Sequence, residues 1–298
     1  MRKELQLFIF FFGIVGGLYS CTSEENVAPT DENGTPLAEL IFTNISYGPD
    51  EQQIFDIYLP EGRSSEKTKV ILLVHGGAWT GGDKQNLDGL VQTLRQQFPE
   101  HAIVNINYVL ASMEAPVVPA FPNQFLDIGA AINKLTREKD NYQILPEFGL
   151  IGTSAGAHLS LMYDFVYDTT DQVKFVADVV GPTDFTDPFY ANDPDFETGL
   201  ALLVDESQYP DGTDYARATS PLYQVNTMSS PAVLFYGNQD PLVPLTNGSN
   251  LSDALTAAKV PHSFTTYNGG HADDWSNDDK RNMQSQLEEY VESYLAIE

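Results

Sequence analysis

A serine between two glycines is the first candidate for chemistry in this chain of 298 residues. Ser154 stands at the centre of GTSAG (residues 152–156), which follows the apolar run FGLI and precedes the helix-period segment AHLSLMYDF. A G-x-S-x-G pattern between a strand and a helix is typical of a tight turn that presents a nucleophilic hydroxyl to backbone N–H groups. The bare pattern also arises by chance, and a serine here could simply cap the helix. Its place between strand and helix favours a nucleophile.

The base that would activate this serine can be chosen nearly by elimination, because the chain has five histidines. His101 precedes an expected strand and His262 begins one, while His158 lies one helical turn beyond Ser154 and is expected to pack against the turn. His271, in GGHA, follows the strand HSFTTY and precedes the last helix. We therefore predict that His271 is the general base, although a loop histidine without chemistry would have the same surroundings.

The fifth histidine opens a glycine-rich segment, HGGAW (residues 75–79), directly after the apolar run VILLV. Together with GTSAG, this segment resembles the α/β-hydrolase esterases of the hormone-sensitive-lipase type and of the feruloyl or acetyl-xylan esterase type. The resemblance runs from about Ile54 to the C-terminus, and an alanine in place of the third glycine makes the HGG-x-W variant of carbohydrate-esterase and arylformamidase relatives the closer match. It implies that an oxyanion would be bound by the backbone N–H groups of Gly77, Ala78 and Ala155.

The same resemblance identifies the third member of a catalytic triad. The strand AVLFY runs into GNQDPLVP (residues 237–244), which matches the acid loop of these esterases and makes Asp240 the expected partner of His271. Such a carboxylate accepts a hydrogen bond from one imidazole nitrogen, so that the other nitrogen faces the serine. Asp184, in GPTDF after the preceding strand, is the competing acid, because some hydrolases of this fold carry it there.

The resemblance implies a two-step acyl transfer in which Ser154 is acylated and water then releases the acid. The expected substrates are small esters or acylated oligosaccharides with short acyl or feruloyl groups. Two other functions stay open. The same residues could hydrolyse amides, as in a dipeptidase-like enzyme, or the fold could be retained as a non-catalytic surface module that binds glycans.

No cofactor and no metal are expected from this sequence. Acidic residues cluster within 273–279, near His271, and within 193–197, but neither cluster has the spacing of a cation-binding loop. Acidic residues in the first turn of a helix are favoured by the helix dipole, which explains the first cluster without a metal.

The elements that would position these residues follow an α/β pattern, in which short apolar runs alternate with helix-period segments. This predicts an α/β-hydrolase fold with a mostly parallel central sheet, helices on both faces and an N-terminal antiparallel hairpin turning at Gly48-Pro49-Asp50. The expected strands are 40–47, 53–59, 70–74, 102–108, 148–151, 176–180, 232–236 and 262–267. The expected helices are 86–98, 125–137, 154–166 and a C-terminal helix through Leu287 and Leu295.

Two segments could shape specificity. Residues 110–122 are proline-rich, and residues 181–230 lie between two expected strands and carry many aromatic side chains. The second segment is a possible cap over the site for a sugar or aryl group, although packing of a small helical excursion would explain the same aromatics.

Composition limits the partners of this chain. There are 42 acidic and 15 basic side chains, a formal net charge of −27, so phosphate backbones would be repelled and nucleic-acid binding is not expected. The length fits one catalytic domain, residues 39–298, and leaves the oligomeric state open.

The N-terminus predicts export. Residues 1–20 carry Arg2 and Lys3 before an apolar run too short to span a bilayer, which is typical of a signal peptide. Cys21, the only cysteine, follows Leu18-Tyr19-Ser20, which resembles a bacterial lipobox and implies acylation of Cys21. Residues 21–38 then read as a flexible tether. We expect an exported protein held to a bacterial membrane, at the outer membrane or cell surface, by this lipid only.

Overall fold

The computed structural model describes residues 37–297, so the expected signal peptide, Cys21 and nearly all of the tether lie outside the described residues. An eight-stranded sheet forms the centre, with strand order β1-β2-β4-β3-β5-β6-β7-β8. The strands are β1 (Leu40–Ser46), β2 (Ile54–Leu59), β3 (Val70–Val74), β4 (Ala102–Ile106), β5 (Phe148–Thr153), β6 (Val173–Val179), β7 (Ala232–Gly237) and β8 (His262–Tyr267).

Pairing within the sheet confirms the expected fold class. Strands β1 and β2 form the antiparallel hairpin, and β2 also pairs antiparallel with β4. From β4 through β8 every pairing is parallel. The carboxyl ends of these parallel strands therefore meet at one edge, where ligands bind in open α/β sheets.

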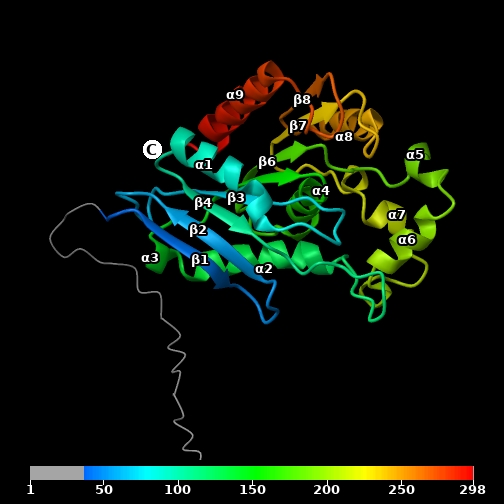
Figure 1. Ribbon diagram of the computed structural model, residues 1–298, viewed down its shortest axis with the longest axis horizontal. Helices are drawn as coiled ribbons and strands as arrows, with labels where there is room; N and C mark the ends of the chain where they lie inside the picture. Colours follow the sequence, from blue (N-terminus) through cyan, green and yellow to red (C-terminus); the bar gives the residue numbers. More distant parts are fainter. Residues whose placement is uncertain (1–36, 298) are drawn as a thin grey trace, which may run out of the picture.

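Helices cover both faces of the sheet (Figure 1). Helices α1 (Asp88–Gln97) and α9 (Asn277–Tyr294) pack on one face, and α2 (Asn123–Arg137), α4 (Ala155–Met162) and α8 (Leu245–Ala258) pack on the other. Strand β3 shows why its sequence is apolar throughout: Val70, Leu72 and Val74 belong to one core and Ile71 and Leu73 to the other. Within residues 37–297, no helix combines the length and apolar character needed to cross a membrane.

Helix boundaries differ from the sequence expectation at three places. The expected helix 86–98 begins as a 3-10 turn, Lys84–Leu87, capped by Asp83. The expected helix 154–166 is α4 followed by a π-helical turn, Tyr163–Tyr167. Helix α8 was not expected, because its sequence LTNGSNLSDALTAA is rich in poor helix formers; burial of Leu251 and Leu255 stabilises it.

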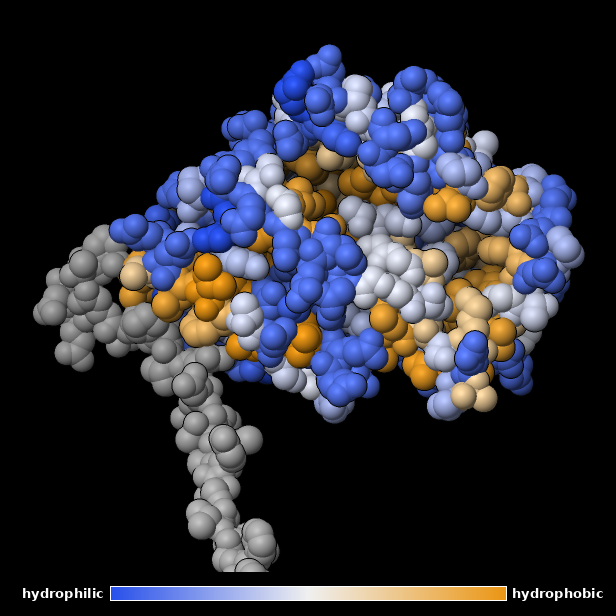
Figure 2. Space-filling model, in the orientation of Figure 1, coloured by the Kyte–Doolittle hydropathy of each residue, from blue (hydrophilic) through white to orange (hydrophobic). Residues whose placement is uncertain are grey.

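The segment 181–230 is a group of short helices standing at one end of the molecule (Figure 1). Figure 2 shows orange, hydrophobic residues over this end, and further orange patches elsewhere on the same face among blue, hydrophilic residues. The remaining short elements within residues 37–297 are α3 (Lys139–Tyr142), α5 (Pro188–Ala191), α6 (Phe196–Leu203), α7 (Tyr215–Ala218) and the 3-10 turns Glu206–Gln208 and Pro221–Tyr223.

Candidate active site

Ser154 lies at the sharp turn between β5 and α4. Its backbone has φ 51° and ψ −121°, a strained conformation for a residue with a side chain, and its N–H donates to Val179 O at 2.8 Å. The flanking glycines are needed for space, because a Cβ on Gly156 would lie 2.1 Å from Val74 O and a Cβ on Gly152 would lie 2.4 Å from the Ala157 Cα. This geometry is that of a nucleophile elbow.

A chain of two hydrogen bonds links Ser154 to His271 and Asp240. The Ser154 Oγ lies 2.9 Å from Nε2 of His271, and Nδ1 of the same ring lies 2.6 Å from Oδ2 of Asp240. Because a carboxylate only accepts, Nδ1 carries the proton and Nε2 presents its lone pair to the serine hydroxyl. The His271 side chain is 21% exposed and that of Asp240 is fully buried, so solvent reaches the imidazole while the carboxylate is shielded.

Asp240 is held in its ionised form by its surroundings. Burial acts to raise its pKa, but hydrogen bonds from His271 and from the N–H groups of Leu242 and Val243 outweigh burial, and the pKa lies below its ordinary value. Asp184, the competing acid, instead accepts from the backbone N–H and the hydroxyl of Thr186. The structure therefore brings Asp240 to His271 and leaves Asp184 in a local turn.

The loop that carries His271 is fixed by backbone contacts. The Gly270 N–H donates to Asp274 Oδ1 at 2.7 Å, and the indole of Trp275 donates to Gly270 O at 3.1 Å. Gly237 allows this loop to come close, since a Cβ there would lie 2.1 Å from Gly270 O. Asp274 thus orders the loop. Among residues 37–297, no three His, Cys, Asp or Glu side chains gather as a group that could hold a metal.

The HGGAW segment approaches the elbow from β3. A Cβ on Gly76 would lie 3.1 Å from the Ser154 Cβ, and Gly77, Ala78 and Trp79 all have positive φ values, of 127°, 48° and 64°. Within the described chain, the N–H groups of the three expected oxyanion donors, Gly77, Ala78 and Ala155, make no hydrogen bond. They are available to a ligand.

A buried polar network anchors the end of this segment, and it was not predicted from the sequence. The Lys84 ammonium, only 4% exposed, pairs with Asp56 on β2 at 2.8 Å. Asn107, after β4, accepts from the Lys84 N–H and donates to Asp83. The sequence signal for this network is Lys84 itself, a basic residue that follows the glycine-rich segment in a strongly acidic chain.

The remaining histidines make structural contacts. His101 and His262 hydrogen-bond to Leu295 O and to Ser252, away from the elbow. His75 stacks on Tyr108 with ring centroids 4.3 Å apart. His158 is fully buried beside the elbow, as expected.

The segment 181–230 touches the acid loop. Tyr190, on α5, donates its hydroxyl to Leu242 O at 3.3 Å, and Asn247 on α8 accepts from the N–H groups of Thr183 and Asp184. Phe189 and Leu242 are 48% and 59% exposed, so apolar surface lies beside the loop that carries Asp240.

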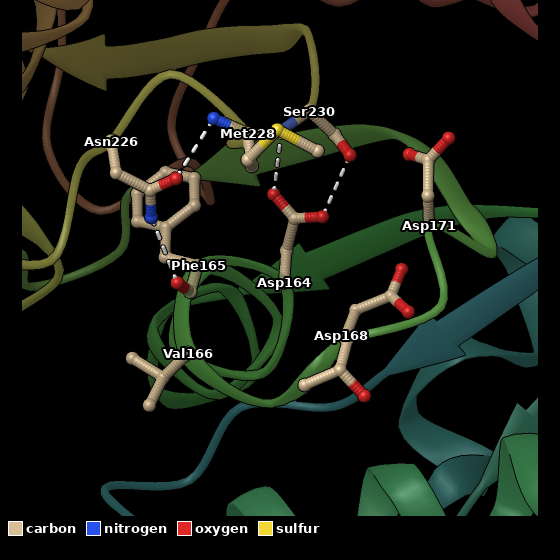
Figure 3. Close-up of a pocket in the computed structure, with 9 residues that line it drawn as sticks. Asp164, Phe165, Val166, Asp168, Asp171, Asn226, Met228 and Ser230 are labelled. Carbon is tan, nitrogen blue, oxygen red and sulfur yellow. Dashed lines mark hydrogen bonds between the residues drawn. The ribbon is translucent and has the colours of Figure 1, made fainter.

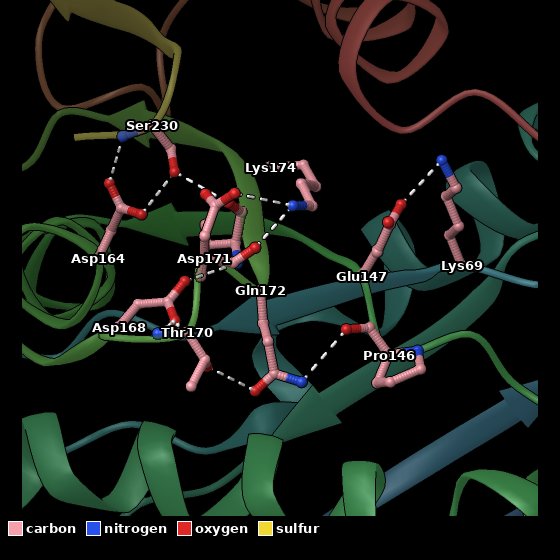
Figure 4. Close-up of polar contacts among 11 residues, drawn as sticks. Lys69, Pro146, Glu147, Asp164, Asp168, Thr170, Asp171, Gln172, Lys174 and Ser230 are labelled. Atoms are coloured by element: carbon pink, nitrogen blue, oxygen red, sulfur yellow. Dashed lines mark hydrogen bonds and ion pairs between the residues drawn. The ribbon is translucent and has the colours of Figure 1, made fainter. Parts of the chain in front are cut away.

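A hollow of about 240 Å³ lies elsewhere, at the far end of the α4 helix (Figure 3). Asp164, which lines it, is ten residues beyond Ser154 and so about 15 Å along the helix. Its carboxylate accepts from the N–H and hydroxyl of Ser230. Asp168 and Asp171 bond to Val173 N and Lys174 (Figure 4), so these acids order the start of β6.

Comparisons with known proteins gave a family match and structural neighbours with the same fold. A family model described as BD-FAE matches residues 55–255. A truncated carbohydrate esterase from gut microbiota superposes with a TM-score of 0.68 over 90% of this chain and 98% of its own, at 22% identity. A thermophilic esterase of the Planctomycetes species Thermogutta terrifontis gives 0.67 over 86% and 92%, at 16% identity. Esterase B from Lactobacillus rhamnosis gives 0.65 over 86% of each chain, at 19% identity. Comparison with curated proteins gave no match.

Proposed function

This chain belongs to the BD-FAE family of α/β-hydrolase esterases and is a carboxylic-ester hydrolase, and from that premise we propose that it works through an acyl-enzyme on Ser154. The observation that carries the proposal is the hydrogen-bonded chain from Ser154 through His271 to Asp240, with distances of 2.9 and 2.6 Å. A serine, a base and an orienting acid in this order can perform acyl transfer without a further group.

The first half of the reaction forms the acyl-enzyme. The Ser154 Oγ attacks the ester carbonyl as its proton passes to His271 Nε2, and the carbonyl oxygen becomes an oxyanion beside the N–H groups of Gly77, Ala78 and Ala155. The C–O bond to the alcohol then breaks, and the imidazolium gives its proton to the leaving oxygen. Asp240 stays ionised and stabilises the imidazolium throughout, in line with its lowered pKa.

The second half repeats these steps with water. His271 removes a proton from a water molecule, the hydroxide attacks the acyl carbonyl, and the acid leaves as Ser154 regains its proton. A burst of alcohol equal to the enzyme concentration, together with an acyl mass on Ser154, is the expected signature when the second half is slower. A burst of alcohol with no acyl adduct in rapid quench would contradict a covalent route.

We further propose that the substrates are neutral carbohydrates carrying short acyl or feruloyl groups. The HGG-x-W pattern supports this, as does the structural neighbour named a carbohydrate esterase. The formal charge of −27 disfavours anionic polyuronates through repulsion, although salt screens this beyond about 8 Å.

A panel of substrates tests this choice. We expect kcat/KM to be highest for acetylated xylan fragments or methyl ferulate, and to fall along nitrophenyl esters from acetate to decanoate. A maximum at decanoate with no release of acetate or ferulate would indicate a lipase-like enzyme. Matched anilides in the same panel would identify an amide hydrolase if they were cut as fast as the esters.

A further inference from the structure

His158 lies where four segments near the candidate site converge. It is on α4, one turn beyond Ser154, and its side chain has no exposed surface. Burial lowers its pKa to about 4, against a hydrogen bond to Thr219 that acts to raise it, so the ring is neutral at physiological pH. The Ser154 hydroxyl is hydrogen-bonded to His271, and the buried ring of His158 faces other partners, so His158 does not transfer a proton to the substrate.

Two hydrogen bonds fix the tautomer of this ring. The indole Nε1–H of Trp79 donates to Nδ1 of His158 at 3.1 Å, so Nδ1 must be unprotonated. The proton is then on Nε2, which donates to Thr219 O at 2.7 Å. The imidazole is thus a bridge between the oxyanion segment (HGGAW, residues 75–79) and the segment 181–230.

Four aromatic rings enclose the bridge. Their centroids lie 5.1 to 5.5 Å from that of His158, and they belong to Trp79, Phe121, Phe125 and Phe185. These rings come from the oxyanion segment, the proline-rich segment 110–122, helix α2 and the segment 181–230. Such packing leaves the imidazole a single orientation.

Contacts of Trp79 fix the position of the backbone at residues 78 and 79. Its carbonyl accepts from the N–H of Ala111 and from the side-chain amide of Gln124, at 2.9 and 2.8 Å, and its indole is held by His158. Ala78 and Trp79 both have positive φ, a conformation that costs free energy for residues with side chains and persists only where contacts enforce it.

We propose that His158 is a positioning residue for the hydrolysis reaction: its neutral imidazole holds Trp79, and through Trp79 it keeps the Ala78 N–H aimed at the oxyanion above Ser154. The bond to Thr219 ties the segment 181–230 to the same point. This inference rests on the proposed function, because it assigns a role in stabilising the oxyanion that the acyl transfer creates.

Trp79→Phe gives the sharpest test, since it removes the indole donor and keeps an aromatic ring in contact with His158. We expect kcat on a nitrophenyl acetate to fall by about 10- to 100-fold with KM changed less than threefold, because a misdirected donor weakens binding of the transition state and not of the substrate. Inactivation by a neutral phosphonate ester, which forms a similar oxyanion, should slow by the same factor.

Variants of His158 itself provide a rescue. His158→Gln can accept from Trp79 and donate to Thr219, so it should retain more kcat than His158→Leu, which can do neither. Ser252→Ala removes a histidine hydrogen bond far from the site and should leave kcat within twofold. If His158→Leu fails to fold, Trp79→Phe still decides the question.

The outcomes separate this inference from the proposed function. An inactive wild-type protein would refute the proposed function itself. An active wild type whose Trp79→Phe variant keeps kcat and the phosphonate rate within twofold would overturn the positioning role alone. A rise in KM at unchanged kcat would overturn it too, because Trp79 would then contact substrate and not aim a donor.

Discussion

Asp240 lies 2.6 Å from His271 Nδ1, on the side of the imidazole that faces away from Ser154. Asp240→Asn should therefore lower kcat by roughly 10³- to 10⁴-fold, because an amide can favour the wrong tautomer and cannot stabilise the imidazolium. Steady-state kinetics on an activated acetate ester would measure the loss. Asp184→Asn is the matched control and should change kcat only a few-fold, whereas a larger loss there than at Asp240 would move the acid to the other loop.

The elbow makes a prediction about folding stability. A Cβ on Gly156 would lie 2.1 Å from Val74 O, so Gly156→Ala forces β3 and α4 apart and should cost more than about 3 kcal/mol. Gly89→Ala is the control, because Gly89 is on helix α1 with no atom within 4 Å of its Cβ position, and it should stabilise by up to about 1 kcal/mol. Urea unfolding would measure both. Equal midpoints for the two variants would show that the elbow tolerates the extra methyl group.

Much of the fold followed from the sequence, for a physical reason. Strands buried on both faces, such as β3 and β7, are continuous apolar runs, and their ends carry the residues of the site. Helix α8 escaped prediction because tertiary burial of Leu251 and Leu255 overrides its weak local propensity.

Part of the candidate site could be predicted from the sequence, and part could not. Ser154 and His271 stand in short patterns whose local structure is characteristic, and the resemblance supplied Asp240. The partners of His158 could not be found this way, because Trp79 and Thr219 are 79 and 61 residues distant along the chain. A hydrogen bond between such segments exists only after the sheet has brought them together.

Asp178 gives a prediction about pH. Its Oδ2 and Gly181 O each lie 2.6 Å from the hydroxyl of Tyr236, which has only one proton to donate. A proton on Asp178 satisfies both contacts, in agreement with burial that raises its pKa to about 7. The folded state then binds more protons than the unfolded state between about pH 4 and 7, so this contribution to stability is present at low pH and is lost as pH rises through 7.

Asp178→Asn removes this titration and keeps the hydrogen-bond pattern, since its amide can donate to Tyr236 and accept from Gly181. Between pH 5 and pH 8, we expect the free energy of unfolding of the variant to rise relative to that of wild type. The expected rise is about 1 to 3 kcal/mol. Urea titrations at both pH values would measure the difference. If the difference in unfolding free energy between variant and wild type were the same at both pH values, Asp178 would be ionised throughout this range.

Cys21 lies outside the described residues, and its acylation stays a prediction from the sequence. Cys21→Ala should abolish incorporation of labelled fatty acid and release the protein from the membrane fraction, because the anchor would be lost. Cells expressing both forms would be fractionated and compared. Full membrane retention of the variant would point to an anchor other than lipid on Cys21.

Labelling of Ser154 by a fluorophosphonate tests the central claim most directly. Wild-type protein should be labelled at Ser154, and Ser154→Ala should lose both the label and hydrolysis of an activated acetate ester, by roughly 10⁴-fold or more, while keeping its thermal stability within a few degrees. Labelling of the variant as strong as that of wild type, or turnover undiminished by the substitution, would contradict the assignment of Ser154 as the nucleophile.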